Sequence, residues 1–248
     1  MIKADNHVYS KFSQDSRVEL KDIAKVAKEK GISYVAVTDK VRFSTQPVKE
    51  AIYRISNRNE KIDRFGKNNG IRFIKGIEVD EPHLYKEELK MLCEETGIDY
   101  VLGTIHQILG IPVKKMVTNP VVLDLYQKSL LQMVEEADID AVGHLDYLKK
   151  FITDPNFDEK IMLDVLDTMI ERDILLEINS SPLRRNGDIY PSRDIITQYK
   201  MLGGDKVIFG SGAHQVTEIY DGIDKIKHGL EDLELEEYIV LDRKQKHI

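Results

Sequence analysis

The sequence has few of the residues that mark several classes of protein. It has one cysteine, no tryptophan, and no run that approaches the roughly 18 to 20 apolar residues of a membrane span. The lone Cys93 excludes an internal disulfide and fits a reducing compartment. Residues 1–6 lack the apolar run of a signal peptide. We therefore expect a cytoplasmic protein without a membrane partner.

A positive charge balance is also missing. The chain carries 36 lysine and arginine residues against 43 aspartate and glutamate residues, which gives a net charge of −7. This balance argues against broad, nonspecific nucleic-acid binding, which needs a basic surface. A small phosphorylated metabolite needs only a local positive site, so it remains open as a partner. The composition does not indicate an oligomeric state.

The chain lacks long linkers and low-complexity segments, and we expect a single domain over residues 1–248. Short β-rich runs alternate with longer helical runs, which is typical of parallel β/α units in an α/β fold. Seven such units suit a barrel better than an open sheet, although periodicity alone does not decide closure. The predicted strands cover residues 2–4, 34–38, 72–77, 100–104, 141–143, 175–179 and 207–210.

Helix signals fill the intervals between these strands. Ser16 and Glu19 have the spacing of a capping box, and Gly31 is a plausible stop for the helix that follows. Pro47 could open a second helix that runs toward Lys67. The lysine-rich segment after Leu241 is expected to be a frayed, solvated end. Further helices are predicted over residues 84–95, 121–136, 158–172, 192–202 and 218–230.

Polar residues recur where the predicted strands end, and in parallel β/α barrels the active site forms at those carboxyl ends. Imidazole and carboxylate groups suit zinc, manganese or iron, so their convergence predicts a metal site. The three remaining histidines, His83, His228 and His247, are expected to be solvated and without a role. In strand order, the converging residues are His7, Asp39 with Lys40, Glu78, His106, His144, Glu177 with Asn179, and His214.

Seven short blocks in a fixed order carry a resemblance to a known family. They are DNHVYSKFSQDS (5–16), VTDK (37–40), GIE (76–78), GTIH (103–106), GHLD (143–146), LEINSS (176–181) and GSGAH (210–214). The sixth block is followed by Leu183-Arg184 and by Tyr190-Pro191-Ser192. Each block alone is a weak signal, but the ordered set resembles the polymerase-and-histidinol-phosphatase (PHP) family. Within that family the chain is most similar to the stand-alone histidinol-phosphate phosphatases.

The resemblance implies a distorted, TIM-like (β/α)7 barrel with up to three divalent metals. It also implies a phosphomonoesterase of histidine biosynthesis that hydrolyses L-histidinol phosphate to L-histidinol and phosphate. In such phosphatases the metals polarise the phosphate and activate a water molecule. The implied ligand sets are a first position with His7, residue 9, Glu78 and residue 212; a second with Glu78, His106 and His144; and a third with Asp15, residue 40 and His214.

Three residues depart from the family pattern. Tyr9 offers a phenol in place of an imidazole and Gly212 removes a carboxylate, so the first position keeps two ligands. Lys40 brings an ammonium group to the third position, where it would repel a cation. We expect it to pair with Asp15 and to stand in for the charge of a metal. The sequence does not separate natural drift from deliberate substitution.

The second position keeps all of its ligands. We predict one well-held divalent ion at Glu78, His106 and His144, most suitably zinc, with manganese or iron as alternatives. These three residues, with Lys40, are the candidate catalytic residues. Taken alone, each of these histidines could be a core residue whose ring merely satisfies a hydrogen bond. Asp15 could simply belong to the entry of the first helix.

Phosphate binding is predicted for Arg184, since a guanidinium binds two phosphate oxygens through parallel hydrogen bonds. Arg42, Asn179 and Ser181 are further candidates, and for Arg42 a surface role weighs more. The leading function is a phosphatase with an incomplete metal centre and reduced activity. The alternative is an inactive barrel that binds a phosphorylated metabolite or a partner. A phosphodiesterase or exonuclease of the same family is a weaker third.

Overall fold

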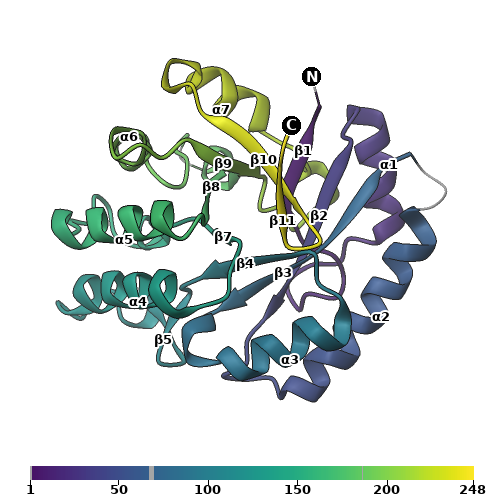
Figure 1. Cartoon of the computed structure of the whole chain (residues 1–248), viewed down its shortest axis with the longest axis horizontal. Coiled ribbons are helices and arrows are strands. Elements are labelled where there is room, and N and C mark those ends of the chain that lie inside the picture. Colours follow the sequence, from purple (N-terminus) through teal and green to yellow (C-terminus); the bar gives the residue numbers. More distant parts are fainter. Residues whose placement is uncertain (1, 67–69, 186) are drawn as a thin grey trace.

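A parallel sheet curved around an inner core forms the centre of the molecule, and helices cover its outer face (Figure 1). The computed structural model describes residues 2–66, 70–185 and 187–248. All seven predicted strands are present, and the first extends further along the chain than the sequence indicates. They are β1 (Ala4–Val8), β2 (Tyr34–Val41), β3 (Arg72–Asp80), β4 (Tyr100–Thr104), β7 (Ala141–Val142), β8 (Leu175–Asn179) and β9 (Lys206–Gly210).

These seven strands are hydrogen-bonded in chain order, each parallel to the next. The two ends of this series approach each other at the carboxyl side. A single parallel bridge joins Val8 to Ala213, with the Tyr9 amide 3.0 Å from the Ala213 carbonyl oxygen. Within the described ranges this bridge is not continued into a ladder. The α/β class with a parallel sheet is therefore confirmed, whereas a closed TIM-like barrel is not.

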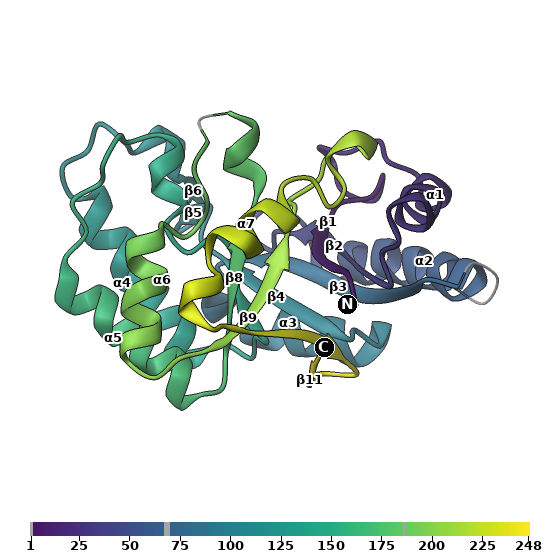
Figure 2. The same ribbon diagram turned by 90° about the horizontal axis from the view of Figure 1, so that it is seen from above.

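The predicted helices are present, with ends that differ from the predicted bounds. Gly31 ends the first helix in the left-handed conformation, with φ +68°, as predicted. The capping box is wrong, because Glu19 is the N-cap and its side chain makes no capping bond. The predicted end of the second helix at Lys67 lies outside the described residues. The helices are α1 (Leu20–Lys30), α2 (Val48–Gly66), α3 (Lys86–Thr96), α4 (Val122–Glu136), α5 (Glu159–Glu171), α6 (Arg193–Met201) and α7 (Ile223–Gly229). Figure 2 shows α4, α5 and α6 on one side of the strands and α1 and α2 on the other.

The C-terminal segment is an antiparallel hairpin of β10 (Glu236–Leu241) and β11 (Lys244–His247), so the prediction of a frayed end is wrong. β10 pairs with the start of β9. It thereby adds Ile239 and Val240 to an inner apolar cluster at the amino ends of the parallel strands. The remaining buried members of that cluster are Ala4, Ala36, Ile74, Tyr100, Leu102, Ala141, Leu175 and Ile208. The hairpin thus covers one end of the curved sheet and leaves the carboxyl ends for a site.

A second, larger apolar cluster lies between the outer face of the sheet and the helices. It holds α1 through Ile23 and Ala27 and α5 through Met162 and Leu166, and the residues of each pair lie four positions apart on one face of their helix. Two short strands that the sequence did not predict, β5 (Gln107–Ile108) and β6 (Ile111–Pro112), form a hairpin directly after His106. In the part of the chain described here, none of the helices has the length and apolar character needed to cross a membrane.

Candidate metal centre

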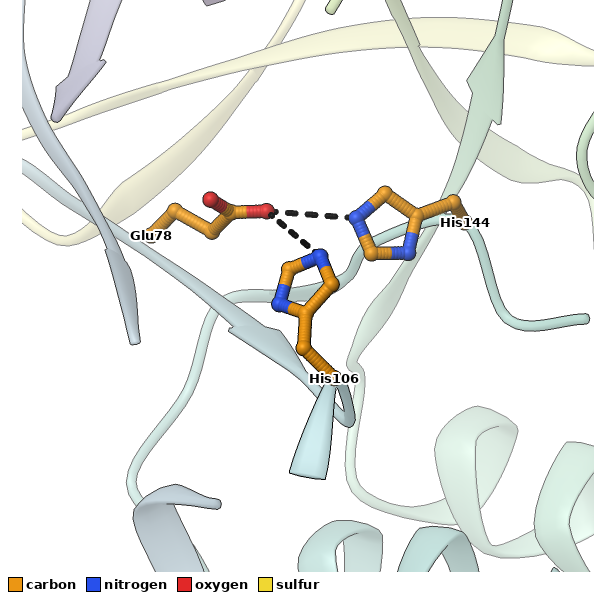
Figure 3. A group of neighbouring side chains, drawn as sticks. All are labelled: Glu78, His106 and His144. Atoms are coloured by element: carbon orange, nitrogen blue, oxygen red, sulfur yellow. Dashed lines mark hydrogen bonds and ion pairs between the residues drawn. The ribbon is translucent and has the colours of Figure 1, made fainter. Parts of the chain in front are cut away.

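Glu78, His106 and His144 converge at the carboxyl ends of β3, β4 and β7 (Figure 3). One ligand atom from each lies within 4.8 Å of the others. The Glu78 Oε1 atom is 3.2 Å from His144 Nε2 and 3.6 Å from His106 Nε2. All three side chains are buried. The predicted trio is confirmed as a cluster that could hold a metal ion.

The hydrogen bonds around His106 favour metal binding. The Thr104 hydroxyl donates its one proton to the Val79 carbonyl oxygen over 3.2 Å. It therefore accepts from His106 Nδ1, which lies 3.2 Å away, and this leaves the Nε2 lone pair facing Glu78. The backbone of the same residue is fixed too, because its amide donates to Asp80 Oδ1 over 2.7 Å. His106 is thus oriented as a ligand by groups behind it.

His144 is held by its backbone. Its φ of +29° is unusual for a residue with a side chain, and its amide donates to Glu177 Oε2 over 2.8 Å. Strained backbone of this kind persists where the surroundings impose it, often at functional sites. Two imidazoles and one carboxylate leave coordination positions open for water or substrate. The donor set therefore fits a divalent cation.

The ionisation of Glu78 and His106 also suits a metal. Burial would raise the pKa of Glu78, but the neighbouring His106, Lys40 and His144 outweigh it, and the pKa lies well below its usual value. Burial depresses the pKa of His106 well below that of free imidazole. A metal is bound by a carboxylate and by neutral imidazole, and these are the forms that Glu78 and His106 favour.

At the first metal position, His7, Tyr9 and Glu78 are linked to one another by short polar contacts. The Tyr9 hydroxyl donates to Glu78 Oε2 over 2.8 Å and lies 2.6 Å from His7 Nε2. The other ring nitrogen of His7 is 2.5 Å from Glu177 Oε1. Burial followed by the charge of Glu78 raises the pKa of Tyr9 well above its ordinary value, so the phenol stays protonated. Both nitrogens of His7 are engaged, and His7 is not part of the three-residue cluster.

Gly212, the other departure at this position, has φ +56°. A Cβ atom built there would lie 3.3 Å from the side-chain amide of Asn179 and from Ser181 Cβ. The position therefore favours glycine through its backbone and its crowding, besides lacking a carboxylate. Asn179 is packed between these groups, since it donates to Glu177 Oε1 and accepts from the Ser181 amide.

At the third position Lys40 pairs with Asp15, as the sequence predicts, with 2.7 Å between Nζ and Oδ2. His214 Nδ1 lies 3.7 Å from the other oxygen of Asp15. The Lys40 ammonium is 4.6 Å from the centre of the Tyr9 ring, and the His214 ring stacks on Tyr9 at 4.1 Å. The substituted residues thus form one packed unit, and the ammonium lies among the third-position residues.

A cavity of about 320 Å³ opens above the trio. His106 and His144 line it together with Asn179, Ser181 and Arg184, so most of the predicted site residues meet here. Sequence reasoning gave no weight to Tyr147 and Lys150, although both follow closely after the His144 block. Four cationic side chains line the cavity, from Lys40, Lys150, Arg184 and Arg185.

Arg184 is fixed at the cavity edge by one end of its guanidinium. Its Nη2 donates to the Ser211 carbonyl oxygen over 3.0 Å, and its Nε lies 3.5 Å from Glu218. Its Nη1 is buried and has no partner among the described residues. A donor of this kind is available for an anion in the cavity.

The structure corrects the expectations for Arg42 and His83. Arg42 does not line this cavity, because it pairs with Asp80 over 3.4 Å and borders a neighbouring hollow with Gln107. His83, expected to be solvated, is 4% exposed, and burial lowers its pKa to about 4. His228 is exposed, as predicted.

Comparisons with known proteins found one family model and several relatives that match this chain. The model of the PHP domain family matches residues 5–181. A probable histidinol-phosphatase of Clostridium acetobutylicum is 25% identical over 225 residues, which cover 85% of this chain and 86% of that protein. A probable histidinol-phosphatase of Thermotoga maritima is 25% identical over 243 residues, covering 97% and 96%.

Among solved structures, the chain is similar to histidinol phosphate phosphatase of Lactococcus lactis, crystallised with zinc, L-histidinol and phosphate. The TM-score is 0.80, the sequence identity is 20%, and the match covers 98% of each chain. At this identity the likeness shows a shared fold.

Proposed function

The chain belongs to the PHP domain family, and from this premise we propose that it is a metal-dependent phosphomonoesterase. L-histidinol phosphate is the substrate that its relatives indicate. The observation that carries the proposal is the buried Glu78, His106 and His144 cluster below a cavity with four cationic side chains. A metal next to a cationic cavity matches the two needs of phosphate ester hydrolysis, an activated water and charge neutralisation.

The trio would hold one divalent ion, zinc by its donor set, with manganese or iron as alternatives. Such an ion would supply a Lewis acid and a water molecule of lowered pKa. Thr104 would keep His106 in the tautomer whose Nε2 faces the ion. Glu177 would keep His144 in place through its backbone amide. We expect activity below that of an enzyme with a complete centre, since Lys40 replaces a divalent charge with a single one.

The cavity side chains would bind the phosphate group. Arg184 offers its unpartnered Nη1, and its other contacts hold the guanidinium at the cavity edge. Lys150 Nζ lies 3.5 Å from the Tyr147 hydroxyl, and within the described parts of the chain it forms no ion pair with a carboxylate, which leaves its charge for a ligand. Asn179 and Ser181 line the same wall. A cavity of about 320 Å³ lies in the size range of small-molecule sites and suits a small monoester.

The test is phosphate release from L-histidinol phosphate by the purified chain, with added zinc or manganese. We expect turnover that depends on the metal and falls by at least about a hundredfold in His144→Asn, because a ligand is lost. His228→Asn is the matched control, since His228 is exposed and its ion-pair partner among the described residues is Glu231. Equal rates in the two variants, or release that survives complete metal removal, would refute the proposal.

A second candidate function is a non-catalytic barrel that binds a phosphorylated metabolite. Tyr9 and Lys40 favour it, because their side chains lie where the family pattern has metal ligands. This candidate predicts a rise in melting temperature with inorganic phosphate or histidinol phosphate, without phosphate release. Arg184→Gln would remove that rise. The same two measurements therefore separate the candidates.

A further inference from the structure

We propose that the Tyr9 hydroxyl takes the place of a second cation beside Glu78, so that the centre accepts one divalent ion. Tyr9 is then a positioning residue that fixes Glu78 as a ligand for that ion. The inference rests on the metal site of the proposed function, but it does not depend on phosphatase activity.

The hydroxyl lies in the space that a shared cation would need. The imidazole of His7 and the carboxylate of Glu78 face each other, with 3.6 Å between Nε2 and Oε1. The Tyr9 oxygen is 2.6 Å from His7 Nε2 and 2.8 Å from Glu78 Oε2. These are hydrogen-bond lengths, whereas zinc lies about 2.0 to 2.2 Å from its nitrogen and oxygen ligands. The phenol therefore joins the two groups that a metal would otherwise join.

Counting protons gives the direction of these bonds. A protonated phenol has one proton, and Tyr9 donates it to Glu78, so it accepts from His7 Nε2. His7 Nδ1 faces the carboxylate oxygen of Glu177 over 2.5 Å. Both ring nitrogens of His7 are therefore turned to hydrogen-bond partners within the protein.

A chain of hydrogen bonds links two candidate ligands. From Glu78 it passes through Tyr9 and His7 to Glu177, whose second oxygen accepts from the His144 amide. Glu78 Oε1 and His144 Nε2, which lie 3.2 Å apart, are left for the ion. Tyr9 therefore fixes the distance between Glu78 and His144 from behind. It also occupies Glu78 Oε2, which leaves Oε1 to face the two histidines.

The Tyr9 ring is held too firmly to swing away. The residue is 3% exposed, the Lys40 ammonium lies over its ring, and the His214 ring stacks on it. Lys40 is in turn fixed by Asp15. The phenol is thus part of a packed wall of the cavity.

The experiment measures metal stoichiometry and affinity without substrate. The wild-type chain is titrated with cobalt(II), followed by visible absorption, and with zinc by competition against a chelating dye. We expect one tightly bound equivalent. In Tyr9→Phe we expect one equivalent with an affinity about 10- to 100-fold weaker, as is typical when a group that orients a ligand is lost. Tyr147→Phe is the matched control, because its hydroxyl lies in the same cavity and contacts Lys150 instead of a ligand.

Several results would overturn the inference. These are two tightly bound equivalents in the wild-type chain, none at all, or an unchanged affinity in Tyr9→Phe. A tyrosinate charge-transfer band with iron(III) that disappears in Tyr9→Phe would make Tyr9 a ligand, which also contradicts it. If Tyr9→Phe does not fold, Tyr9→His takes its place. That variant puts a third ligand beside His7 and Glu78 and should gain a second equivalent, and failure to gain one counts against the inference.

The measurements distinguish a failure of this inference from a failure of the proposed function. One equivalent that weakens in Tyr9→Phe, together with no phosphate release from any monoester, would uphold the inference and refute the phosphatase. Two equivalents together with rapid hydrolysis would do the reverse.

Discussion

Arg58 and Asp39 form an ion pair in which neither side chain is exposed to solvent, with 3.4 Å between Nη1 and Oδ2. The guanidinium also donates to the Gly76 carbonyl oxygen, two residues before Glu78. The carboxylate accepts from the backbone and the hydroxyl of Ser10. The pair therefore ties together the three segments that carry Tyr9, Lys40 and Glu78.

Replacing Arg58 with methionine should be strongly destabilising. The change leaves the Asp39 carboxylate buried without its cation, which typically costs about 3 to 5 kcal/mol. Urea denaturation followed by circular dichroism measures the loss. Arg64→Met is the control, because Arg64 is 78% exposed and its pairing with Glu60 should contribute less than about 1 kcal/mol. A loss below 1 kcal/mol in Arg58→Met would contradict this account.

The parts of the site that follow from strand ends could be predicted from the sequence. Glu78, His106 and His144 each follow a short β-rich run, and parallel strands bring their carboxyl ends together. The Lys40 and Asp15 pair was also predicted, from their opposite charges and from the third ligand set that the family resemblance implies. The role of the Tyr9 hydroxyl could not be, because it depends on side-chain directions and on how closely β1 approaches the segment after β9.

The errors have physical causes as well. The last strand, Lys244–His247, has no apolar alternation, so nothing local indicates a hairpin. Its turn is held from outside, by Arg243 binding Asp138 and Asp140. His83 looked solvated because it lies in a polar stretch of sequence, but it belongs to a short 3-10 turn that packs on α4. Both outcomes were decided by contacts between segments distant in the sequence.

The C-terminal hairpin should contribute to global stability. Ile239 is fully buried in the inner cluster, and truncating such a side chain costs about 2 to 5 kcal/mol. We expect Ile239→Ala to lower the free energy of unfolding by that amount and to leave cobalt affinity unchanged, since the metal cluster lies at the opposite strand ends. Leu109→Ala, at a residue that is 76% exposed, should change stability by less than about 0.5 kcal/mol. If Ile239→Ala unfolds along the same curve as the wild type, the hairpin detaches in solution.

Gly212 should resist substitution for two separable reasons. Gly97 has a similar φ of +59° but open space around it, so Gly97→Ala should cost only the left-handed strain, about 1 kcal/mol. Gly212→Ala adds the contacts with Asn179 and Ser181, and we expect a larger loss, about 2 kcal/mol in all. Thermal or urea unfolding of the two variants measures the difference. Equal losses of stability in Gly97→Ala and Gly212→Ala would show that Asn179 and Ser181 move aside without cost. A carboxylate could then be restored at position 212.

His83 should make the stability of the fold depend on pH below neutrality. Burial lowers its pKa to about 4, while the unfolded chain keeps a value near 6.5. Between these values the unfolded state binds a proton that the folded state does not, so stability falls as the pH falls through this window. The slope reaches at most about 1.4 kcal/mol per pH unit, and the total loss by pH 4 is about 2 to 3 kcal/mol.

The measurement compares urea denaturation of wild type and His83→Asn from pH 7 to pH 4. Other buried acids titrate in both proteins, among them Asp146, whose pKa burial raises to about 6, so only the difference reports His83. If the wild type has the larger free energy of unfolding at pH 7, this difference should shrink or reverse as the pH falls, because the variant has no imidazole to protonate. His228→Asn, at an exposed histidine, should run parallel to wild type throughout. A difference between wild type and His83→Asn that stays constant with pH would mean that His83 titrates alike in the folded and unfolded states.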